Sequence, residues 1–317
     1  MQVKPDPDFL DRFNAALVKL HVPREDRIMV AVSGGPDSLA LLLLADAARP
    51  GQIMAATVDH QLRPESANEA AYVANICRRL EISHVILTPG VPIEGNIQSS
   101  ARTARYALLH HAAAEHACPH VATAHHADDQ LETILMRLAR GSGVDGLSAI
   151  RPHNGNIIRP LLRFTKQELV GLCESAAIET VSDPSNENPD FARVAMRQWL
   201  AQASHPLRAD RAARTADAIA EAADALAWMT HQFAQERVTK TDAEVFCDAT
   251  GLPAELQRRL LLHSIALIDP FLEPRGDAVD HLLHKMESGA SAMIGDILCR
   301  GGACWHFTKA PARRTAQ

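Results

Sequence analysis

The sequence lacks any apolar run long enough to cross a lipid bilayer. A transmembrane helix requires roughly 18–20 consecutive apolar residues, whereas the longest run, Leu39–Ala45, stops at Asp46. The N-terminal residues include acids and prolines, where a signal peptide has a basic segment followed by an apolar one. We therefore expect a cytoplasmic protein that has no membrane partner.

Paired cysteines are also absent. Six cysteines are scattered along the chain, and no two of them form a CxxC pair. A disulfide framework is not expected in a cytosolic chain of this size, and the scattered spacing argues against a tetrathiolate zinc or iron–sulfur site. We predict free, buried thiols and no bound structural metal at these positions: Cys77, Cys118, Cys173, Cys247, Cys299 and Cys304.

Aromatic residues are few, and the net charge is negative. Only two Tyr and three Trp occur among 317 residues, whereas Ala and Leu are abundant, which favours helix. The length is sufficient for two domains. Residues 137–214 hold eleven basic and eight acidic side chains, so this stretch carries +3 and the remainder −9 of the total −6. Phosphate binding depends on local cationic surface, so the negative net charge does not exclude a nucleic-acid partner. The alternative interpretation of this stretch is an ordinary solvated helix surface.

Strand-like and helix-like segments alternate over the first 140 residues. Short β-branched runs end near residues 32, 58, 87 and 124, and a helical pattern follows each of them. Strands that alternate with helices of this length predict a parallel sheet covered on both faces, an α/β fold. Ligands of such sheets bind at the carboxyl ends of the strands. At these ends we expect Ser33, Asp59 and His125.

The pattern changes after Arg140. A glycine-containing loop follows, and Thr165 with Glu168 three residues later has the spacing of a capping box at the start of a helix. From residue 209 onward, alanine-rich helical patterns dominate, with a small hairpin expected around Arg300. We predict a catalytic domain over residues 1–208 and a smaller, mainly helical domain over residues 209–317.

The segment Ser33–Ser38 (SGGPDS) has the composition of a phosphate cradle between a strand and a helix. Its glycines allow main-chain N–H groups to approach an anion closely. The serines offer hydroxyl donors, and the following helix directs its positive end at the same point. The Lys of a Walker A loop is missing, which argues against a kinase-type loop. The alternative is a strand–helix turn that happens to contain serines.

This segment resembles the PP-loop, SGGxDS, of the ATP pyrophosphatases, enzymes that cleave ATP between its α- and β-phosphates. The resemblance implies a parallel-sheet PP-loop (adenine nucleotide alpha hydrolase-like) domain and a loop that grips pyrophosphate. For Asp37 it implies a catalytic role, either in holding Mg²⁺ or in ordering the loop. The implied ATP-binding residues are Ser33, Gly34, Gly35, Pro36, Asp37 and Ser38.

Further blocks resemble the tRNA(Ile)-lysidine synthase family. Val58–Ala70 is similar to the family segment DHxLRxxSxxEA, which implies that Asp59 and His60 lie beside the nucleoside of ATP. Arg102 and Arg105 lie on one face of the next predicted helix. The resemblance implies a catalytic role for Arg105, although surface arginines are the alternative for both.

The segment 124–133 (AHHADDQLET) is similar to the family block AHHxxDQxET. Asp129 and Glu132 are three residues apart on a predicted helix, so both carboxylates are expected to face the pocket, where they suit a cationic amino acid or Mg²⁺. A solvated helix face and a metal-dependent phosphohydrolase are the alternatives. With the RPLL and DPSN blocks, the resemblance implies these substrate-binding residues: His125, Asp183, Asn186, Arg193 and Arg197.

The family resemblance implies a two-step reaction. ATP adenylates O2 of the wobble cytidine of an isoleucine tRNA with a CAU anticodon, and the ε-amine of free lysine then attacks C2 and expels AMP. ATP and Mg²⁺ are the implied cofactors, and a tRNA-contacting role for residues 209–317 is a hypothesis. The alternatives are a tRNA thiolase, which usually has catalytic cysteines, an NAD or GMP synthetase relative, and a non-enzymatic nucleotide-binding module.

Overall fold

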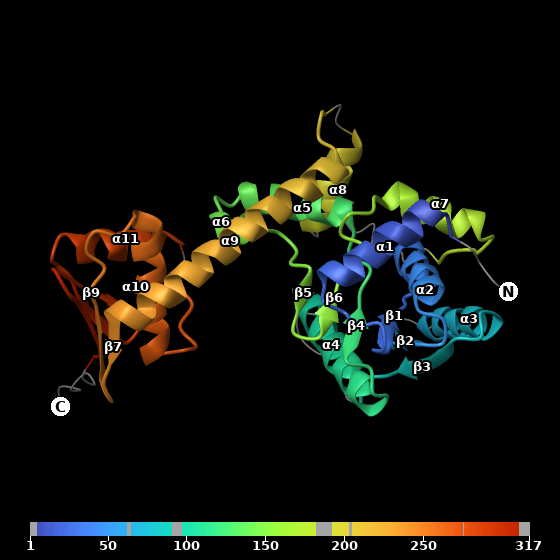
Figure 1. Ribbon diagram of the computed structural model, residues 1–317, viewed down its shortest axis with the longest axis horizontal. Coiled ribbons are helices and arrows are strands. Elements are labelled where there is room, and N and C mark those ends of the chain that lie inside the picture. Colours follow the sequence, from blue (N-terminus) through green and yellow to red (C-terminus); the bar gives the residue numbers. More distant parts are fainter. Residues whose placement is uncertain are drawn as a thin grey trace. The chain divides into compact units, whose positions relative to one another are not determined.

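The computed structural model describes residues 5–61, 65–90, 97–181, 192–202, 205–274 and 276–310. The chain divides into two compact units, residues 1–218 and 219–317 (Figure 1). This division lies ten residues after the boundary predicted from the sequence. Among the described residues, no helix combines the length and the apolar character needed to span a bilayer.

A sheet of six strands forms the centre of the first unit, as far as it is described, in the order β3-β2-β1-β4-β6-β5 (Figure 1). The pairs from β3 to β6 are parallel, and only β5 pairs in the antiparallel direction. The predicted parallel α/β sheet is therefore confirmed. The strands are β1 Ile28–Ala31, β2 Ile53–Val58, β3 Ser83–Leu87, β4 His120–Ala122, β5 His153–Asn154 and β6 Ile157–Ile158.

Side chains of a strand alternate between the two faces of the sheet, and here both faces are apolar. Helices therefore cover both faces. Ile28 and Val30 of β1 join a core with α1, α2, α3 and α7, whereas Met29 between them packs with α4 on the other face. The loops that contain Ser33, Asp59 and His125 follow the carboxyl ends of β1, β2 and β4. The helices are α1 Pro7–Lys19, α2 Pro36–Ala48, α3 Ser66–Arg79, α4 Ile97–Glu115, α5 Ala127–Leu138, α6 Val144–Leu147, α7 Lys166–Ser175 and α8 Ala192–Gln202.

The capping box predicted at the start of α7 is confirmed. The Glu168 carboxylate accepts a hydrogen bond from the Thr165 backbone N–H at 2.7 Å, and the Thr165 hydroxyl accepts one from the Glu168 N–H at 3.3 Å. Glu168 also binds Arg12 of α1, at 2.6 Å from Nη1 to Oε1. This contact ties α1, a helix that the sequence patterns did not predict, to the first turn of α7.

A five-stranded antiparallel sheet forms the second unit, in the order β7-β8-β11-β10-β9. The hairpin predicted around Arg300 corresponds to β10 and β11, and the sheet extends beyond it on both sides. Helices pack on one face, where Val245, Phe307 and Leu260 are fully buried. The elements are α9 Ala209–Arg237, which begins in the first unit, β7 Val238–Lys240, β8 Glu244–Cys247, α10 Ala254–Ile268, α11 Gly276–Glu287, β9 Ser291–Ile294, β10 Ile297–Arg300 and β11 Trp305–Lys309.

All six cysteines are free thiols, as predicted, and five of them are buried. The prediction of burial is wrong for Cys304, which is exposed in the turn before β11. Burial raises the pKa of the thiols of Cys77, Cys173 and Cys299 to about 12 and of Cys247 to about 11. The thiolate is the reactive form, so these buried sulfurs are inert at neutral pH.

We expect a disulfide reagent such as DTNB to modify one thiol per native chain at neutral pH. Cys304 is the exposed thiol, whereas the others are buried and hard to ionise. Unfolding in urea should expose all six, and Cys304→Ser should remove the fast reaction. Rapid reaction of a second thiol in the native Cys304→Ser variant would contradict the described cores.

Candidate active site

The loop Ser33–Ser38 joins β1 to α2 and is held in shape by one hydroxyl. Ser38 Oγ accepts a hydrogen bond from the Ser33 backbone N–H and donates one to the Gly35 carbonyl, both at 3.0 Å. No side chain caps α2 at Gly35. The first N–H groups of this helix therefore keep their capacity to bind an anion, and the helix dipole adds attraction. This geometry supports the predicted phosphate cradle.

Gly34 adopts a backbone conformation that favours glycine, with φ of +85°. A Cβ built there would lie 3.3 Å from Val181 Cγ2 and 3.4 Å from Val73 Cγ2, closer than most Cβ contacts. The Gly34 carbonyl accepts a hydrogen bond from the Val181 N–H at 2.9 Å. The loop is therefore fixed by backbone geometry on one side and by the segment after α7 on the other.

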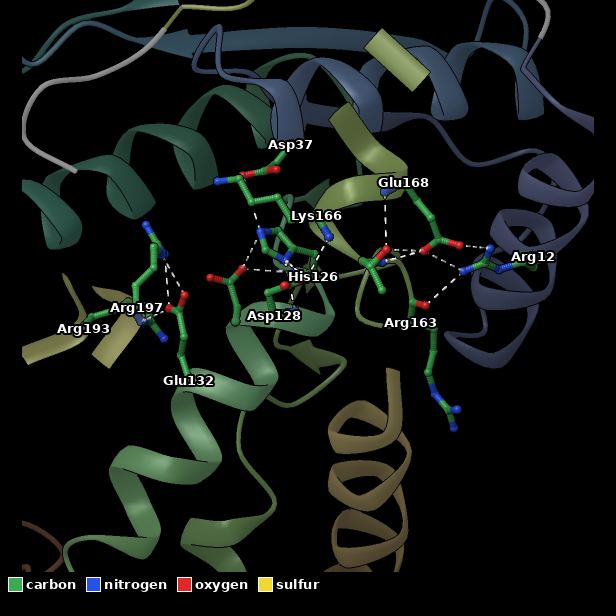
Figure 2. Close-up of polar contacts among 12 residues, drawn as sticks. Arg12, Asp37, His126, Asp128, Glu132, Arg163, Lys166, Glu168, Arg193 and Arg197 are labelled. Carbon is green, nitrogen blue, oxygen red and sulfur yellow. Dashed lines mark hydrogen bonds and ion pairs between the residues drawn. The ribbon is translucent and has the colours of Figure 1, made fainter. Parts of the chain in front are cut away.

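Three carboxylates surround the buried imidazole of His126 (Figure 2). Its Nε2 lies 3.5 Å from Asp37 Oδ2 and 3.6 Å from Asp129 Oδ2, and its Nδ1 lies 3.5 Å from Asp128 Oδ2. His126 is also the N-cap residue of α5, and its backbone N–H donates to Asp129 Oδ2 at 3.0 Å in a capping box. The sequence resemblance pointed to its neighbour His125 and not to His126. Its place at the start of a helix rich in acids was the available signal.

These carboxylates set the charge of the ring. Burial opposes protonation, but the contacts with Asp128 and Asp37 and the charge of Asp129 outweigh it and raise the pKa of His126 to about 10. The Asp128 backbone N–H approaches Nδ1 at 3.2 Å and would favour a neutral ring. One amide contact is weaker than three nearby carboxylates, so we assign an imidazolium. Burial raises and His126 lowers the pKa of Asp37, and the net effect is a lowered value.

Helix α7 supplies a second cation to the same cluster (Figure 2). The Lys166 backbone N–H donates to Asp128 Oδ2 at 2.8 Å, and Lys166 Nζ lies 4.0 Å from Asp37 Oδ2. Asp37 Oδ1 is buried and has no hydrogen-bond partner among the described residues. The described part of the chain holds no group of three His, Cys, Asp or Glu side chains suited to a metal. A cation at Asp37 would therefore need ligands from elsewhere, such as phosphate oxygens.

Asp129 and Glu132 make different contacts, although both belong to α5. Asp129 faces His126, whereas the nearly fully buried Glu132 binds Arg197 at 2.8 Å and 3.2 Å in a bidentate pair. Arg193 Nε lies 3.5 Å from Glu132 Oε2, and its Nη2 donates to the Thr133 hydroxyl at 2.9 Å. Glu132 thus holds α8 against α5, with its charge matched by two arginines (Figure 2). These contacts differ from the arrangement expected from the sequence, in which both carboxylates face the pocket.

His125 follows β4 and is neutral at pH 7. Burial is the main cause, because it disfavours the charged ring, and it lowers the pKa of His125 to about 4 against the opposing charge of Asp129. Three positive side chains act in the same direction as burial. A partly buried neutral ring amid positive charge is suited to contact with an anionic substrate. The three side chains are Arg102, Arg159 and Arg193.

Asp59 and His60 lie at the carboxyl end of β2, as expected. Asp59 Oδ1 accepts hydrogen bonds from the Gln61 N–H at 2.9 Å and the Ser66 hydroxyl at 2.6 Å, so it orders the entry into α3. His60 Nδ1 is buried without a partner among the described residues. Burial and the charge of Arg105 lower the pKa of His60.

Two predicted substrate-binding residues, Asp183 and Asn186, lie outside the described residues. The other candidates fall into three groups along one edge of the sheet. Asp37 and Asp129 meet at His126, His125 lies among arginines, and His60 lies near Arg105. The arrangement combines the Ser33–Ser38 cradle, the carboxylates paired with His126, and the arginines near His125 and His60.

The PP-loop domain family matches residues 6–204 of this chain. A curated tRNA(Ile)-lysidine synthase from Zymomonas mobilis subsp. mobilis is 40% identical over 314 residues, which cover 96% of this chain and 95% of that protein. The corresponding protein of Novosphingobium aromaticivorans is 38% identical over 298 residues, covering 91% and 90%. Among solved structures, the U34-tRNA thiolase NcsA from Methanococcus maripaludis superposes with a TM-score of 0.56 at 17% identity, over 68% of this chain and 78% of that one. The last similarity concerns the fold alone.

We expect Gly34→Ala and Ser38→Ala to lower the rate of ATP consumption by at least tenfold while the protein stays folded. The first forces a left-handed conformation that costs about 1–2 kcal/mol, and the second removes the hydroxyl that bonds Ser33 and Gly35. Initial rates of pyrophosphate release and circular dichroism measure both effects. Gly51→Ala is the matched control, since φ is +74° there and no atom lies within 4 Å of a built Cβ. Equal rates in Gly34→Ala and Gly51→Ala would refute the cradle.

In the nucleotide-free protein, we expect His126 to be cationic and His125 neutral between roughly pH 5 and pH 9, because their pKa values are about 10 and about 4. Ring-nitrogen NMR shifts measure both states. The His126 contribution to folding stability should be complete below its ordinary pKa near 6.5 and disappear as pH rises through about 10. Titration of His126 close to neutral pH would contradict the carboxylate cluster.

Proposed function

The chain belongs to the tRNA(Ile)-lysidine synthase family, and from this premise we propose that it joins free lysine to C2 of the wobble cytidine of isoleucine tRNA with a CAU anticodon. It is a ligase that uses ATP through a PP-loop domain. The observation that carries the proposal is the 40% identity across 96% of the chain. We place the reaction in the cytoplasm, where ATP, lysine and tRNA occur together.

Activation of the cytidine requires control of the departing pyrophosphate. We assign this role to the N–H groups of the Ser33–Ser38 loop and the first turn of α2, where no side-chain cap competes for them. Preorganised donors of this kind stabilise charge that grows in the transition state. Asp59, His60 and Arg105 are proposed to line the nucleoside end, where the buried Nδ1 of His60 has unused hydrogen-bonding capacity.

Mg²⁺ fits one position in this site. Asp37 offers a buried carboxylate oxygen that has no partner among the described residues, and Mg²⁺ prefers such oxygens together with phosphate oxygens and water. When bound, the ion would neutralise charge on the phosphates of ATP. Lys166 and His126 already balance part of the negative charge of Asp37, so this chain's own residues keep the carboxylate ionised in readiness.

Attack by lysine requires a group that holds its ammonium and accepts a proton. We propose Asp129 for this role, since its carboxylate is in the His126 cluster and is not part of an arginine pair in the described contacts. Glu132 is proposed to act through Arg193 and Arg197, which it holds in place for the RNA. His125 is proposed to contact the same substrate. Asp183 and Asn186 stay candidates on sequence grounds.

The chemistry of the site does not favour a tRNA thiolase. The cysteine that contacts the cradle is Cys173, whose Sγ lies 3.3 Å from the Pro36 carbonyl. Burial raises the pKa of this thiol to about 12, so it does not supply a nucleophilic thiolate at neutral pH. A thiolase would need reactive sulfur at this edge of the sheet.

We expect net product only when ATP, lysine and CAU-anticodon isoleucine tRNA are all present, with AMP and pyrophosphate formed together. Labelled lysine, nucleotide chromatography and mass spectrometry of the wobble nucleoside follow the three products. A tRNA with a different anticodon is the control. A cytidine that gains sulfur, or AMP that accumulates while the tRNA mass stays unchanged, would exclude lysidine synthesis.

Asp129→Asn should reduce lysine use by more than tenfold, because a charge-assisted contact is worth roughly 1.5–3 kcal/mol. The amide can still accept the hydrogen bond from His126 N–H, so the start of α5 should persist. The ratio kcat/KM for lysine and that for ATP are measured separately. Glu115→Gln, an exposed acid on α4, is the control. An unchanged lysine dependence would remove Asp129 from the lysine site.

A further inference from the structure

A cavity of about 300 Å³ lies in the first unit, lined by α1, residues 159–164 and the start of α9. It is distinct from the Ser33–Ser38 cradle, none of whose residues lines it. Its wall is largely apolar and includes Ala15, Leu20 and Pro160. The volume is at the lower end of the range for small-molecule sites, so one nucleotide-sized group is the appropriate scale.

The charged residues of the lining have an excess of positive charge. Arg12, Lys19, Arg159 and Arg163 contribute four cations, whereas Asp217 is the single carboxylate in the lining. Asp217 binds Arg163 Nη2 at 2.6 Å and lies 3.5 Å from Lys19 Nζ. Arg12 is neutralised by Glu168. Asp217 thus contacts two of the cations and Glu168 contacts a third, whereas neither carboxylate pairs with the fourth in the described part of the chain.

Arg159 is that fourth cation. It is only 7% exposed, and its Nη1 donates a hydrogen bond to the Arg151 carbonyl at 2.8 Å. Its Nε has no hydrogen-bond partner, and no acidic side chain pairs with it in the described part of the chain. A buried guanidinium without a counter-ion is costly, so it is typically retained for an anion that binds there. Arg159 lies close to the segment that contains His125. The Thr123 N–H, two residues before His125, donates to the carbonyl of Ile158, directly before Arg159.

We infer that this cavity binds one phosphate-bearing nucleotide of the RNA substrate, with the phosphate at Arg159 and Lys19 and the base on the apolar wall formed by α1. This inference rests on the proposed function for the identity of the RNA. Guanidinium and ammonium groups suit phosphate oxygens, and an apolar wall suits the face of a base. The cavity would hold a nucleotide other than the target cytidine, because the target must reach the cradle.

Two rim variants test the cavity without disturbing the core. Lys19 and Ala15 are both exposed on α1, so Lys19→Gln removes a cation and Ala15→Phe fills the space. Each should raise KM for tRNA by about tenfold, the size expected for one charge-assisted contact, and leave KM for ATP and kcat unchanged. Lys19→Gln should also lower the slope of log affinity against log salt by about one.

Matched controls are available on exposed helix and loop positions. Arg24→Gln removes an exposed cation five residues after Lys19 in the sequence, and Ala114→Phe adds an aromatic ring on α4. Neither residue lines the cavity, so both variants should keep the wild-type KM for tRNA. Arg159→Gln should give the largest loss of tRNA affinity in direct binding. If that variant does not fold, the two rim variants still decide the question.

The outcomes separate this inference from the proposed function. An unchanged KM for tRNA in Lys19→Gln and Ala15→Phe, with normal lysidine formation, overturns the cavity and leaves the function intact. If AMP raises the melting temperature of the wild type but not of Lys19→Gln while tRNA binding is unaffected, the ligand is a free nucleotide and the RNA source is overturned. If the wild type makes no lysidine but both rim variants bind tRNA more weakly, the cavity stands and the proposed function fails.

Discussion

The packing of carboxylates around one buried imidazole organises the end of the sheet that holds the candidate active site. His126 draws together Asp37 from α2 and Asp128 and Asp129 from α5, and Lys166 of α7 closes the cluster. Three helices that follow or flank the sheet thereby meet at one point beside the phosphate cradle. Each of the three carboxylates lies within 4 Å of a ring nitrogen of His126. Without a cation at the centre, they would repel one another strongly. Asp37 beside the cradle, the proposed lysine site at Asp129 and the Asp128 contact to α7 all surround that cation.

Much of this edge was predictable because local patterns determine it. The strands β1 to β4, the capping box at Thr165 and the loop at Ser33 each follow from a few consecutive residues, and the structure contains all of them. The pairing of Glu132 with Arg197 was not predictable, since it joins residues 65 positions apart and cancels a charge that the sequence presented as free. His126 was overlooked for the same reason: its partners include Asp37, which only folding brings near.

The second unit shows a different limit of sequence patterns. Its five strands are three to five residues long, too short for the alternation of side chains to stand out. β8, for example, buries Val245 and Cys247 and leaves Glu244 and Phe246 partly exposed, but its four residues lie between turn-forming segments. Long helical patterns in α9 to α11 dominated the sequence, so the prediction placed only one hairpin where a five-stranded sheet forms.

One hydrogen bond links the nucleotide loop to a distant part of the chain. The carbonyl of Gly34 accepts from the backbone of Val181, two positions before Asp183 in the sequence. Because the two segments share this bond, a shift of the loop would change the energy of the segment at Val181. Thermodynamic linkage makes such coupling reciprocal, so a ligand that displaces Val181 would in turn alter the affinity of the loop for nucleotide. A glycine that contributes no side chain can thus transmit a change in the loop through its main-chain carbonyl.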